Sequence, residues 1–564
     1  MNNPTHTPAL SPVEKIKVAS NYLRGTLQES LQDNATGTIA EDDTQISKFH
    51  GIYQQDDRDV REERRRQMLE PDHSFMIRAR VPGGVCTPAQ WLALDDIATR
   101  WANHSLRITT RQAFQFHGVF KRDLKTSIQA INKSLLDTIA ACGDVNRNVM
   151  CTPLPELSAL HAQVYQAAAS VSEHLTPHTS AYHEIWLDRK KLAGSVDHEP
   201  IYGESYLPRK FKIAFAIPPQ NDVDVQAHDL GFIAIEEDGK LAGFTVTVGG
   251  GMGATHGDPT TYPRLADVLG WCRPEQVNEV SEAIVTIQRD FGNRSERRHA
   301  RFKYTLAKYG LEWLRKELKQ RLGYALEPAR PFVFTGNGDK YGWQQSVDGH
   351  WHLLLFTENG RLADTDRAKQ LTGMREIARI HRGDFRLTPN QNVIIANVDA
   401  KHKDEIDALV DGHGLDTYKR ISQLRLHSMA CVALPTCSQA MAEAERYLPD
   451  LTGQIEDLLV KHQLQDQPIT IRMTGCANGC ARPYLAEIGL VGKAPGRYNL
   501  HLGAAFNGTR LNRMASENID EEEILATLDQ LFGNFKDSRQ QNETFGDFLV
   551  RTHPVWQKEE QQDD

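Results

Sequence analysis

Four of the eight cysteines gather near the end of the chain, where their spacing suggests a metal-binding group. They form a C-x5-C pair and a C-x3-C pair, namely Cys431, Cys437, Cys476 and Cys480. Thiolates hold iron–sulfur clusters, with four ligands for a two-iron or a four-iron cluster. Gly475 and Gly479 stand beside the second pair, where they permit a close backbone approach to a cluster and let N–H groups point at sulfur.

Spacing alone leaves three interpretations of this cysteine group open. The first is an iron–sulfur cluster and the second is a zinc site. The cluster is favoured, because structural zinc sites usually use tighter C-x2-C or C-x4-C pairs. The third interpretation is a set of unrelated buried thiols, which behave as small hydrophobes. Eight cysteines in 564 residues are too few for a disulfide scaffold, so a metal role in a reducing compartment is predicted.

A second group of residues is cationic. Arg78 and Arg80 alternate on one predicted strand, so both point to the same face. Such a pair is usually a solvated face, yet further cations stand beside strands or turns in the same way: Arg107, Arg111, Arg147, Lys210 and Lys212. Their convergence would suit a polyanionic ligand, with arginine giving bidentate contacts and lysine acting as a point charge.

The elements that must position these residues occur twice. Residues 106–119 resemble residues 385–398, 75–85 resemble 353–362, and 148–155 resemble 428–435, always about 279 residues apart. Each matched segment has the pattern of a strand ending in turn chemistry, and residues 88–102 between them have helical spacing. Duplication of a whole module is therefore predicted, with two halves that pack as pseudo-symmetric partners in an α+β fold.

The differences between the two copies point to function. Arg78 and Arg147 in the first copy face Leu355 and His427 in the second, and Arg111 faces Asn390. The first copy keeps cations, whereas the second carries the four late cysteines. One half is therefore predicted to bind anions and the other to bind metal, with a joint site at their junction.

Composition excludes several classes of protein. Asp plus Glu is 74 and Lys plus Arg is 65, so a net charge of −9 argues against general nucleic-acid binding. No apolar run approaches the ~18 residues of a membrane span, and the first residues resemble neither a signal nor a transit peptide, which makes the cytoplasm the expected location. The G-x-G-x-x-A pattern at 249–254 lacks a following helix, so a dinucleotide site is rejected. His117 is interpreted as a structural histidine.

Eight motifs together resemble the sulfite and nitrite reductase family. They are KFHGIYQQDDRDVR, RARVPGG, LRITTRQAFQFHG, NRNVMCTPLP, LPRKFK, MACVALPTC, TGCANGC and GLVGKAPGRYNLHLG. The resemblance runs from residue 20 to residue 551, and the N-terminal motif and the C-terminal FGDF favour the NADPH-dependent branch. It implies a pseudo-two-fold duplicated module with three domains. The implied division is an N-terminal arm over 1–74, a duplicated ferredoxin-like domain over 75–139 and 342–418, a first cofactor and substrate domain over 140–341, and a cluster domain over 419–564.

The resemblance also implies residue roles. The four late cysteines would hold a 4Fe–4S cluster, and Cys480 would in addition be the axial ligand of sirohaem. Sulfite would be bound by Arg78, Arg147, Lys210 and Lys212. The sirohaem would contact Arg107, Arg111, Gln115 and Asn478. One local departure is Gly143, where an amide side chain is expected.

The implied activity is the six-electron reduction of sulfite to sulfide in assimilatory sulfur metabolism and cysteine biosynthesis. Electrons would come from a separate flavoprotein (alpha) subunit that uses NADPH, FAD and FMN, in a hetero-oligomer. The charge-rich first 70 residues either dock that partner or wrap the core. Alternatives are a nitrite reductase on the same scaffold and a non-catalytic, metal-stabilised binding protein.

Overall fold

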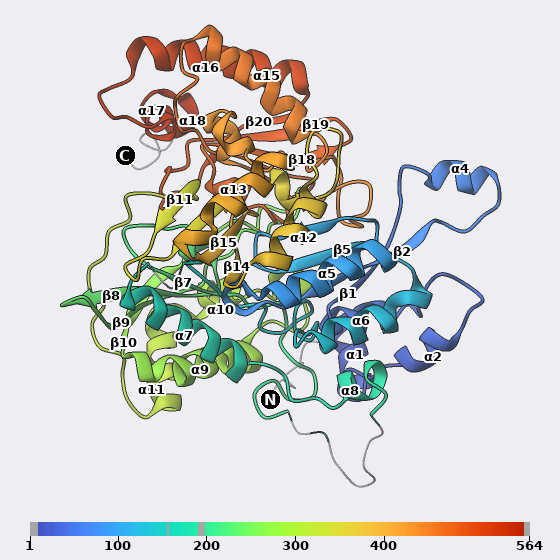
Figure 1. Ribbon diagram of the computed structural model, residues 1–564. Coiled ribbons are helices and arrows are strands. Elements are labelled where there is room, and N and C mark those ends of the chain that lie inside the picture. Colours follow the sequence, from blue (N-terminus) through green and yellow to red (C-terminus); the bar gives the residue numbers. More distant parts are fainter. Residues whose placement is uncertain (1–8, 155–156, 190–196, 198, 558–564) are drawn as a thin grey trace.

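The computed structural model describes residues 9–154, 157–189, 197 and 199–557. Within these residues the chain forms four five-stranded sheets, each with helices against it (Figure 1). The sheets form two pairs, and the members of each pair come from opposite halves of the chain. Strands and helices mix throughout, so the predicted α+β class is confirmed.

The first pair of sheets exchanges strands between the two copies. One sheet has the order β1 (Ile52–Asp56), β2 (His73–Ala79), β5 (Phe114–Val119), β4 (Leu106–Ile108) and β13 (Arg361–Leu362). The other has the order β11 (Gly342–Gln345), β12 (Trp351–Leu355), β15 (Val393–Val398), β14 (Asp384–Leu387) and β3 (Val85–Cys86). Each copy thus lends one short strand to the edge of the other sheet, as β13 pairs with β4 and β3 pairs with β14.

The second pair of sheets repeats a single topology. One has the order β10 (Asp267–Cys272), β9 (Lys240–Val248), β8 (Leu230–Glu237), β7 (Ile213–Ala216) and β6 (Met150–Cys151). The other has the order β16 (Ser428–Ala430), β17 (Ile471–Thr474), β18 (Ile488–Ala494), β19 (Arg497–Leu502) and β20 (Arg513–Ile519). In both, the first two pairings along the chain are parallel and the last two antiparallel. This shared order confirms the duplication predicted from three short sequence matches.

Helices cover the sheets in matching sets. Against the first pair of sheets lie α5 (Pro88–Trp101), α6 (Leu124–Lys133), α12 (Gln370–Ile380) and α13 (Lys403–Gly412). The sheet of β6–β10 is packed by α7 (Ala159–His174), α9 (Val277–Phe291), α10 (Phe302–Tyr309) and α11 (Leu311–Leu322). The last sheet is packed by α15 (Leu448–Lys461), α16 (Glu521–Ser538), α17 (Phe545–Thr552) and α18 (Pro554–Gln557) (Figure 1).

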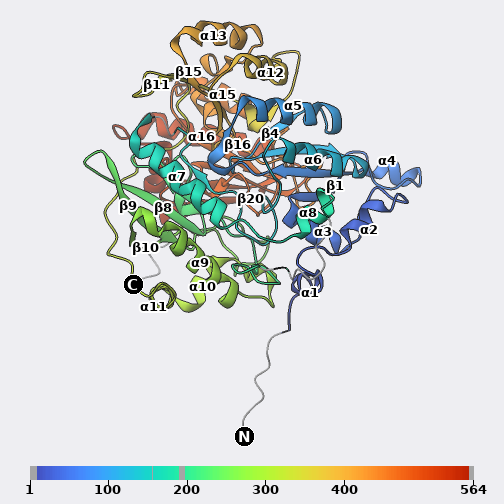
Figure 2. The same ribbon diagram turned by 60° about the horizontal axis from the view of Figure 1, so that its bottom comes forward.

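Short helices complete the described chain. They are α1 (Pro12–Ala19), α2 (Leu27–Gln32), α3 (Asp43–Ile46), α4 (Arg61–Arg66), α8 (Ala181–Trp186) and α14 (Gln423–Leu426). Helix α4 contains no buried residue and projects away from the body of the molecule between β1 and β2 (Figures 1 and 2).

Two glycines make the close approach between the copies possible. Gly84 and Gly360 both have φ of +76° and precede the exchanged strands. A Cβ on Gly84 would lie 2.6 Å from the Leu387 carbonyl oxygen, and one on Gly360 would lie 2.1 Å from that of Ile108. Since Leu387 and Ile108 are equivalent in the sequence repeat, the two contacts are reciprocal, as a pseudo-two-fold arrangement requires.

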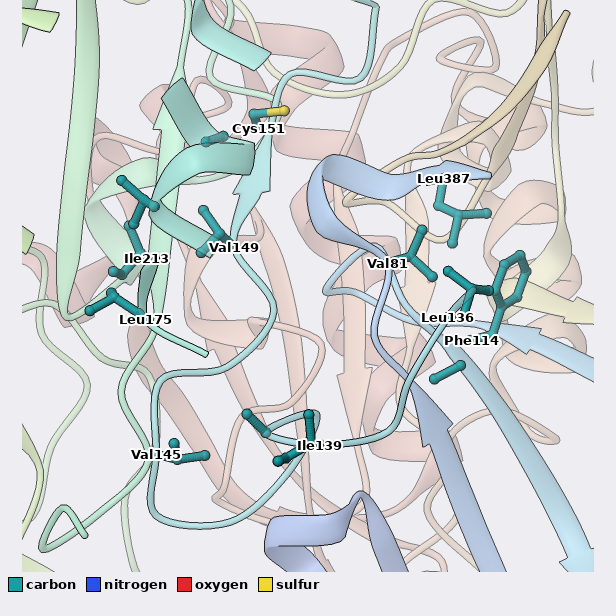
Figure 3. Packing of buried hydrophobic residues seen from close by; sticks show 14 of the residues in the cluster. Val81, Phe114, Leu136, Ile139, Val145, Val149, Cys151, Leu175, Ile213 and Leu387 are labelled. Atoms are coloured by element: carbon teal, nitrogen blue, oxygen red, sulfur yellow. The ribbon is translucent and has the colours of Figure 1, made fainter. Parts of the chain in front are cut away.

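The largest core runs across both copies. Val81 and Phe114 of the first copy pack beside Leu387 of the second (Figure 3). Because apolar surface from both copies is buried in one cluster, neither copy of the first sheet pair has a closed core of its own.

The N-terminal segment wraps the core over most of its described length. Strand β1 forms the edge of a sheet beside β2, and the Lys17 amino group donates to the Leu207 carbonyl at 2.7 Å. The domain boundaries expected from the sequence stay a prediction, because strands cross between the copies. No described helix is both long enough and apolar enough to cross a membrane.

Candidate active site

The two cysteine pairs follow neighbouring parallel strands. Cys431 comes directly after β16 and Cys476 follows β17, and these strands pair in parallel. The carboxyl ends of parallel neighbours meet at one edge of a sheet, so both loops begin side by side. The Cys431 N–H donates to the Met473 carbonyl at 3.2 Å and fixes the two loops to each other.

The cysteine sulfur atoms lie near N–H groups and within electrostatic range of one another. The Gly475 N–H points at Cys431 Sγ at 3.4 Å, as expected from the sequence, and Asn478 Nδ2 lies 3.6 Å from Cys476 Sγ. Burial raises the pKa values of Cys431, Cys437 and Cys476, and the Cys480 thiol beside each of them raises these values further. These three thiols therefore favour the protonated form until a metal displaces their protons.

Within the part of the chain that is described, no three His, Cys, Asp or Glu side chains converge in the geometry of a single bound metal ion. Cys480 is exposed, whereas Cys476 is buried and Cys431 and Cys437 are partly buried. Cys480 acts electrostatically on the other three thiols, and the role of the four cysteines as metal ligands stays a prediction.

The predicted anion-binding cations also come from neighbouring segments. Arg147 precedes β6, and Lys210 and Lys212 precede β7, the parallel neighbour of β6. The Arg147 N–H donates to the Phe211 carbonyl at 2.9 Å, which places the arginine between the two lysines along the paired segments. Arg147 Nε donates to the Gly143 carbonyl at 2.8 Å. Gly143, where an amide side chain was expected, therefore contacts Arg147 through its backbone.

Arg78 and Arg111 complete the cationic group. Arg78 on β2 donates to Cys142 Sγ at 3.3 Å, and Arg111 in the β4–β5 turn donates to the Ile213 carbonyl at 2.8 Å. The buried Nε atoms of both arginines have no hydrogen-bond partner among the described residues. Arg80, in contrast, forms an ion pair with Asp137 at 2.6 Å.

The charges in this group are poorly balanced. Burial, together with the charges of Arg209 and Arg301, lowers the pKa of Lys210 to about 7. Burial, Lys210 and Arg111 hold the pKa of Lys212 well below its usual range. Both lysines are largely buried but keep partial solvent access. Such an arrangement fits a bound polyanion, because an anion would offset the cost of crowding like charges.

Cys480 connects the two groups. Its thiol interacts with Cys431, Cys437 and Cys476 on one side. The same thiol also lies within electrostatic reach of Arg78, Lys210 and Lys212. One residue therefore borders both the metal-binding thiols and the anion-binding cations.

Arg107 and Gln115 have protein partners of their own. Arg107 Nε pairs with Glu445 Oε2 at 2.8 Å, Nη1 donates to Gln115 Oε1 at 3.1 Å, and Nη2 donates to the Ala430 carbonyl at 3.0 Å. Arg107 thereby holds the residue before Cys431 in place. A direct contact of either residue with a cofactor stays a prediction.

Sequence reasoning missed the residue that fixes the Cys480 loop. Arg482 Nε pairs with Asp224 at 2.6 Å, while its Nη atoms donate to the carbonyls of Thr110 and Pro389 at 3.1 and 3.0 Å. Thr110 and Pro389 are equivalent turn residues of the two copies, so Arg482 sits where the copies meet. Its position two residues after the C-x3-C pair was the available signal.

Other missed residues extend the cationic group. Arg209 stands directly before Lys210, and Lys48 and Tyr53 lie in the KFHGIYQQ segment. Burial and Cys142 raise the pKa of Tyr53 above its ordinary value, and Arg147 opposes this effect. The N-terminal segment therefore reaches the cations as well as covering the core.

Two rejected candidates have structural roles. Strand β9 leads into a loop and then β10, without a helix after 249–254, and the Ala254 N–H donates to the Ala477 carbonyl at 2.9 Å. The glycine-rich loop thus packs against the cysteine loop. His117 is buried, and burial together with Arg361 holds its pKa well below the usual range.

Family models match this chain in three stretches. The description "Nitrite/Sulfite reductase ferredoxin-like half domain" matches residues 66–134 and 344–412, and "Nitrite and sulphite reductase 4Fe-4S domain" matches residues 167–326. The chain belongs to the nitrite and sulfite reductase family. The half domain matches twice, in agreement with the duplication. The 4Fe-4S match covers the first copy of the second sheet pair, outside the four late cysteines.

Relatives within this family align over nearly the whole chain. A sulfite reductase (NADPH) hemoprotein beta-component of Myxococcus xanthus (strain DK1622) is 61% identical and covers 98% of each chain. The protein of that name from Xylella fastidiosa (strain M23) is 59% identical and covers 96% of each. The structure of the Mycobacterium tuberculosis NirA protein has a TM-score of 0.80 at 24% identity, covering 97% of this chain and 98% of that one, and shows the shared fold.

The buried lysines are expected to make the cofactor-free protein more stable as pH rises from about 7 to about 8.5. Lys210 and Lys303 have folded pKa values of about 7, against 10.5 for an ordinary lysine. Over this window each of these two lysines binds more protons in the unfolded than in the folded chain, so its contribution to the free energy of unfolding increases with pH. A pH series of melting temperatures tests this, and Lys210→Met should flatten the slope. An unchanged slope in that variant would contradict the charge crowding.

Proposed function

We propose that this protein reduces sulfite to sulfide with six electrons, at a sirohaem coupled to a 4Fe–4S cluster. The observation that carries the proposal is the position of Cys480 between the thiol group and the cationic group. The relatives' name and the 4Fe-4S family model support sulfite reduction and both cofactor types. When bound, the cluster and sirohaem supply electrons and the iron that sulfite approaches.

The chain's cysteines would hold the cofactors. Cys431, Cys437, Cys476 and Cys480 are the proposed cluster ligands, and Cys480 would also border the sirohaem. Arg111 and Asn478 are proposed to contact the sirohaem, whose carboxylates would offset the crowded cations. Arg107 and Gln115 are also proposed to contact the sirohaem. Arg107 already donates to Gln115 and to the carbonyl of Ala430, the residue before Cys431.

Four cations would bind and orient the substrate. Arg78 and Arg147 carry donors that can hold sulfite oxygens, and Lys210 and Lys212 add point charges. Preorganised cations stabilise negative charge that develops as S–O bonds break. With a pKa of about 7, Lys210 Nζ is suited to donate a proton to a departing oxygen.

A partner would deliver the electrons. The relatives' name, hemoprotein beta-component, supports an alpha component in a hetero-oligomer. We propose that this partner is a flavoprotein that oxidises NADPH through FAD and FMN, and that the pair works in the cytoplasm in assimilatory sulfur metabolism and cysteine biosynthesis. The division into an arm, a duplicated ferredoxin-like domain and two cofactor domains is part of the same proposal.

Cofactor content and substrate preference test the proposal. The protein would be purified from cells that make sirohaem, and its absorption spectrum, iron and acid-labile sulfide would be measured on one sample. The expected result is a haem spectrum, one haem iron and a full 4Fe–4S complement, with faster turnover of sulfite than of nitrite. Preference for nitrite would assign the other activity of the family. Zinc without haem or labile sulfide would leave only a structural role for the cysteines.

A further inference from the structure

A segment of the N-terminal arm closes over the loop that carries Cys437. The Arg58 N–H donates to the Pro435 carbonyl at 3.4 Å. Its Nη1 donates to the carbonyls of Cys437 and Ala440 at 3.3 and 2.8 Å. The neighbouring Asp59 pairs with Arg446, beyond the same loop, at 2.6 Å. Two adjacent arm residues thus fasten the backbone around Cys437 from a distance of nearly 380 residues in sequence.

The charge of Arg58 is not neutralised by the protein. Among the described residues it forms no ion pair, and its Nη1 partners are neutral carbonyls. The side chain is half-buried, so solvent screens its charge less than on an open surface.

We propose that Arg58 is a positioning residue for the iron–sulfur cluster, which holds the Cys437 loop and stabilises the reduced cluster through its positive charge. The inference rests on the proposed function for the presence of the cluster. Reduction adds one negative charge to the cluster, and a nearby uncompensated cation favours the more negative state. Net charge, hydrogen bonds and solvent exposure are the protein's means of setting a cluster's potential.

The same contact gives the arm a second role. Arg58 lies two residues after β1, and the exposed helix α4 begins three residues later. Any movement of this segment would withdraw the charge from the Cys437 loop. Movement of the arm at the protein surface would then change the midpoint potential of the cluster.

The test compares midpoint potentials of the cluster in the full-length protein carrying both cofactors. An anaerobic redox titration would be followed by EPR and visible absorption, with labile sulfide assayed on each sample. Arg58→Gln should shift the potential to a more negative value, whereas Arg58→Lys, which keeps the charge, should remain near wild type. The matched control is Arg61→Gln, since Arg61 lies on the same arm and pairs with Asp56 away from the cysteine loops.

Each possible outcome of this test either supports or rejects the proposal. An unshifted potential in Arg58→Gln with full labile sulfide would overturn the proposal, and so would equal shifts in Arg58→Gln and Arg58→Lys. If Arg58→Gln loses its cluster, Arg58→Lys decides: a wild-type potential supports the role of the charge, and a shifted one rejects it. Absence of labile sulfide from the wild-type protein would contradict the proposed function itself, and this inference with it.

Discussion

Replacing Cys480 with serine is expected to remove both cofactor signals and to lower sulfite turnover more than about a hundredfold, since loss of even outer-shell partners of a metal site costs about 10–100-fold. Cys480 borders the other three thiols and also the cationic group. The measurement combines iron, labile sulfide, the haem spectrum and sulfite turnover on one preparation.

The matched control is Cys272→Ser. Cys272 is buried at the end of β10, and burial raises the pKa of its thiol to about 12, so it is an inert structural residue. This variant should lose some stability but keep its cofactors and its turnover per folded molecule. Normal cofactor content and activity in Cys480→Ser would reject the bridging role.

The sequence predicted that the four late cysteines act as one group, and the fold supplies a physical reason for their proximity. Ligand pairs that come directly after two strands must lie together if the strands are parallel neighbours, as β16 and β17 are. The three matched segments also sufficed to predict the duplication, because each marks a strand and a turn that recur in both copies. Local patterns of this kind can be predicted from the sequence because they depend on few contacts between distant residues.

Long-range partners could not be predicted in this way. Arg107 reads as a free cation in the sequence, yet its ion pair with Glu445 spans 338 residues. The exchange of β3 and β13 and the role of Arg482 likewise depend on how the two copies dock. A pattern along the chain gives the type of each residue but not its partner, and the partner decides whether an arginine is structural or available to a ligand.

Arg147→Ala is expected to lower sulfite turnover by about 100-fold or more, the usual loss when one preorganised donor is removed. Arg147 is buried, and its Nε and Nη1 donate to the carbonyls of Gly143 and Ala141. Among the described residues Arg147 has no carboxylate partner, so its charge is available to an anion. The haem spectrum and labile sulfide should persist, and KM for sulfite should rise. Arg147→Lys should recover part of the loss, because it restores the charge without the planar fork.

The control for Arg147 is Arg375→Ala, which removes an arginine that does have a carboxylate partner. Arg375 pairs with the buried Asp95 between α12 and α5, far in sequence from the site. Its loss leaves a buried charge unpaired, so the melting temperature should fall while kcat and KM per folded molecule stay unchanged. The two variants thus separate a cation that serves the fold from one that serves the substrate. Unchanged turnover in Arg147→Ala would remove Arg147 from the substrate-binding group and leave the crowded cations as partners of the sirohaem alone.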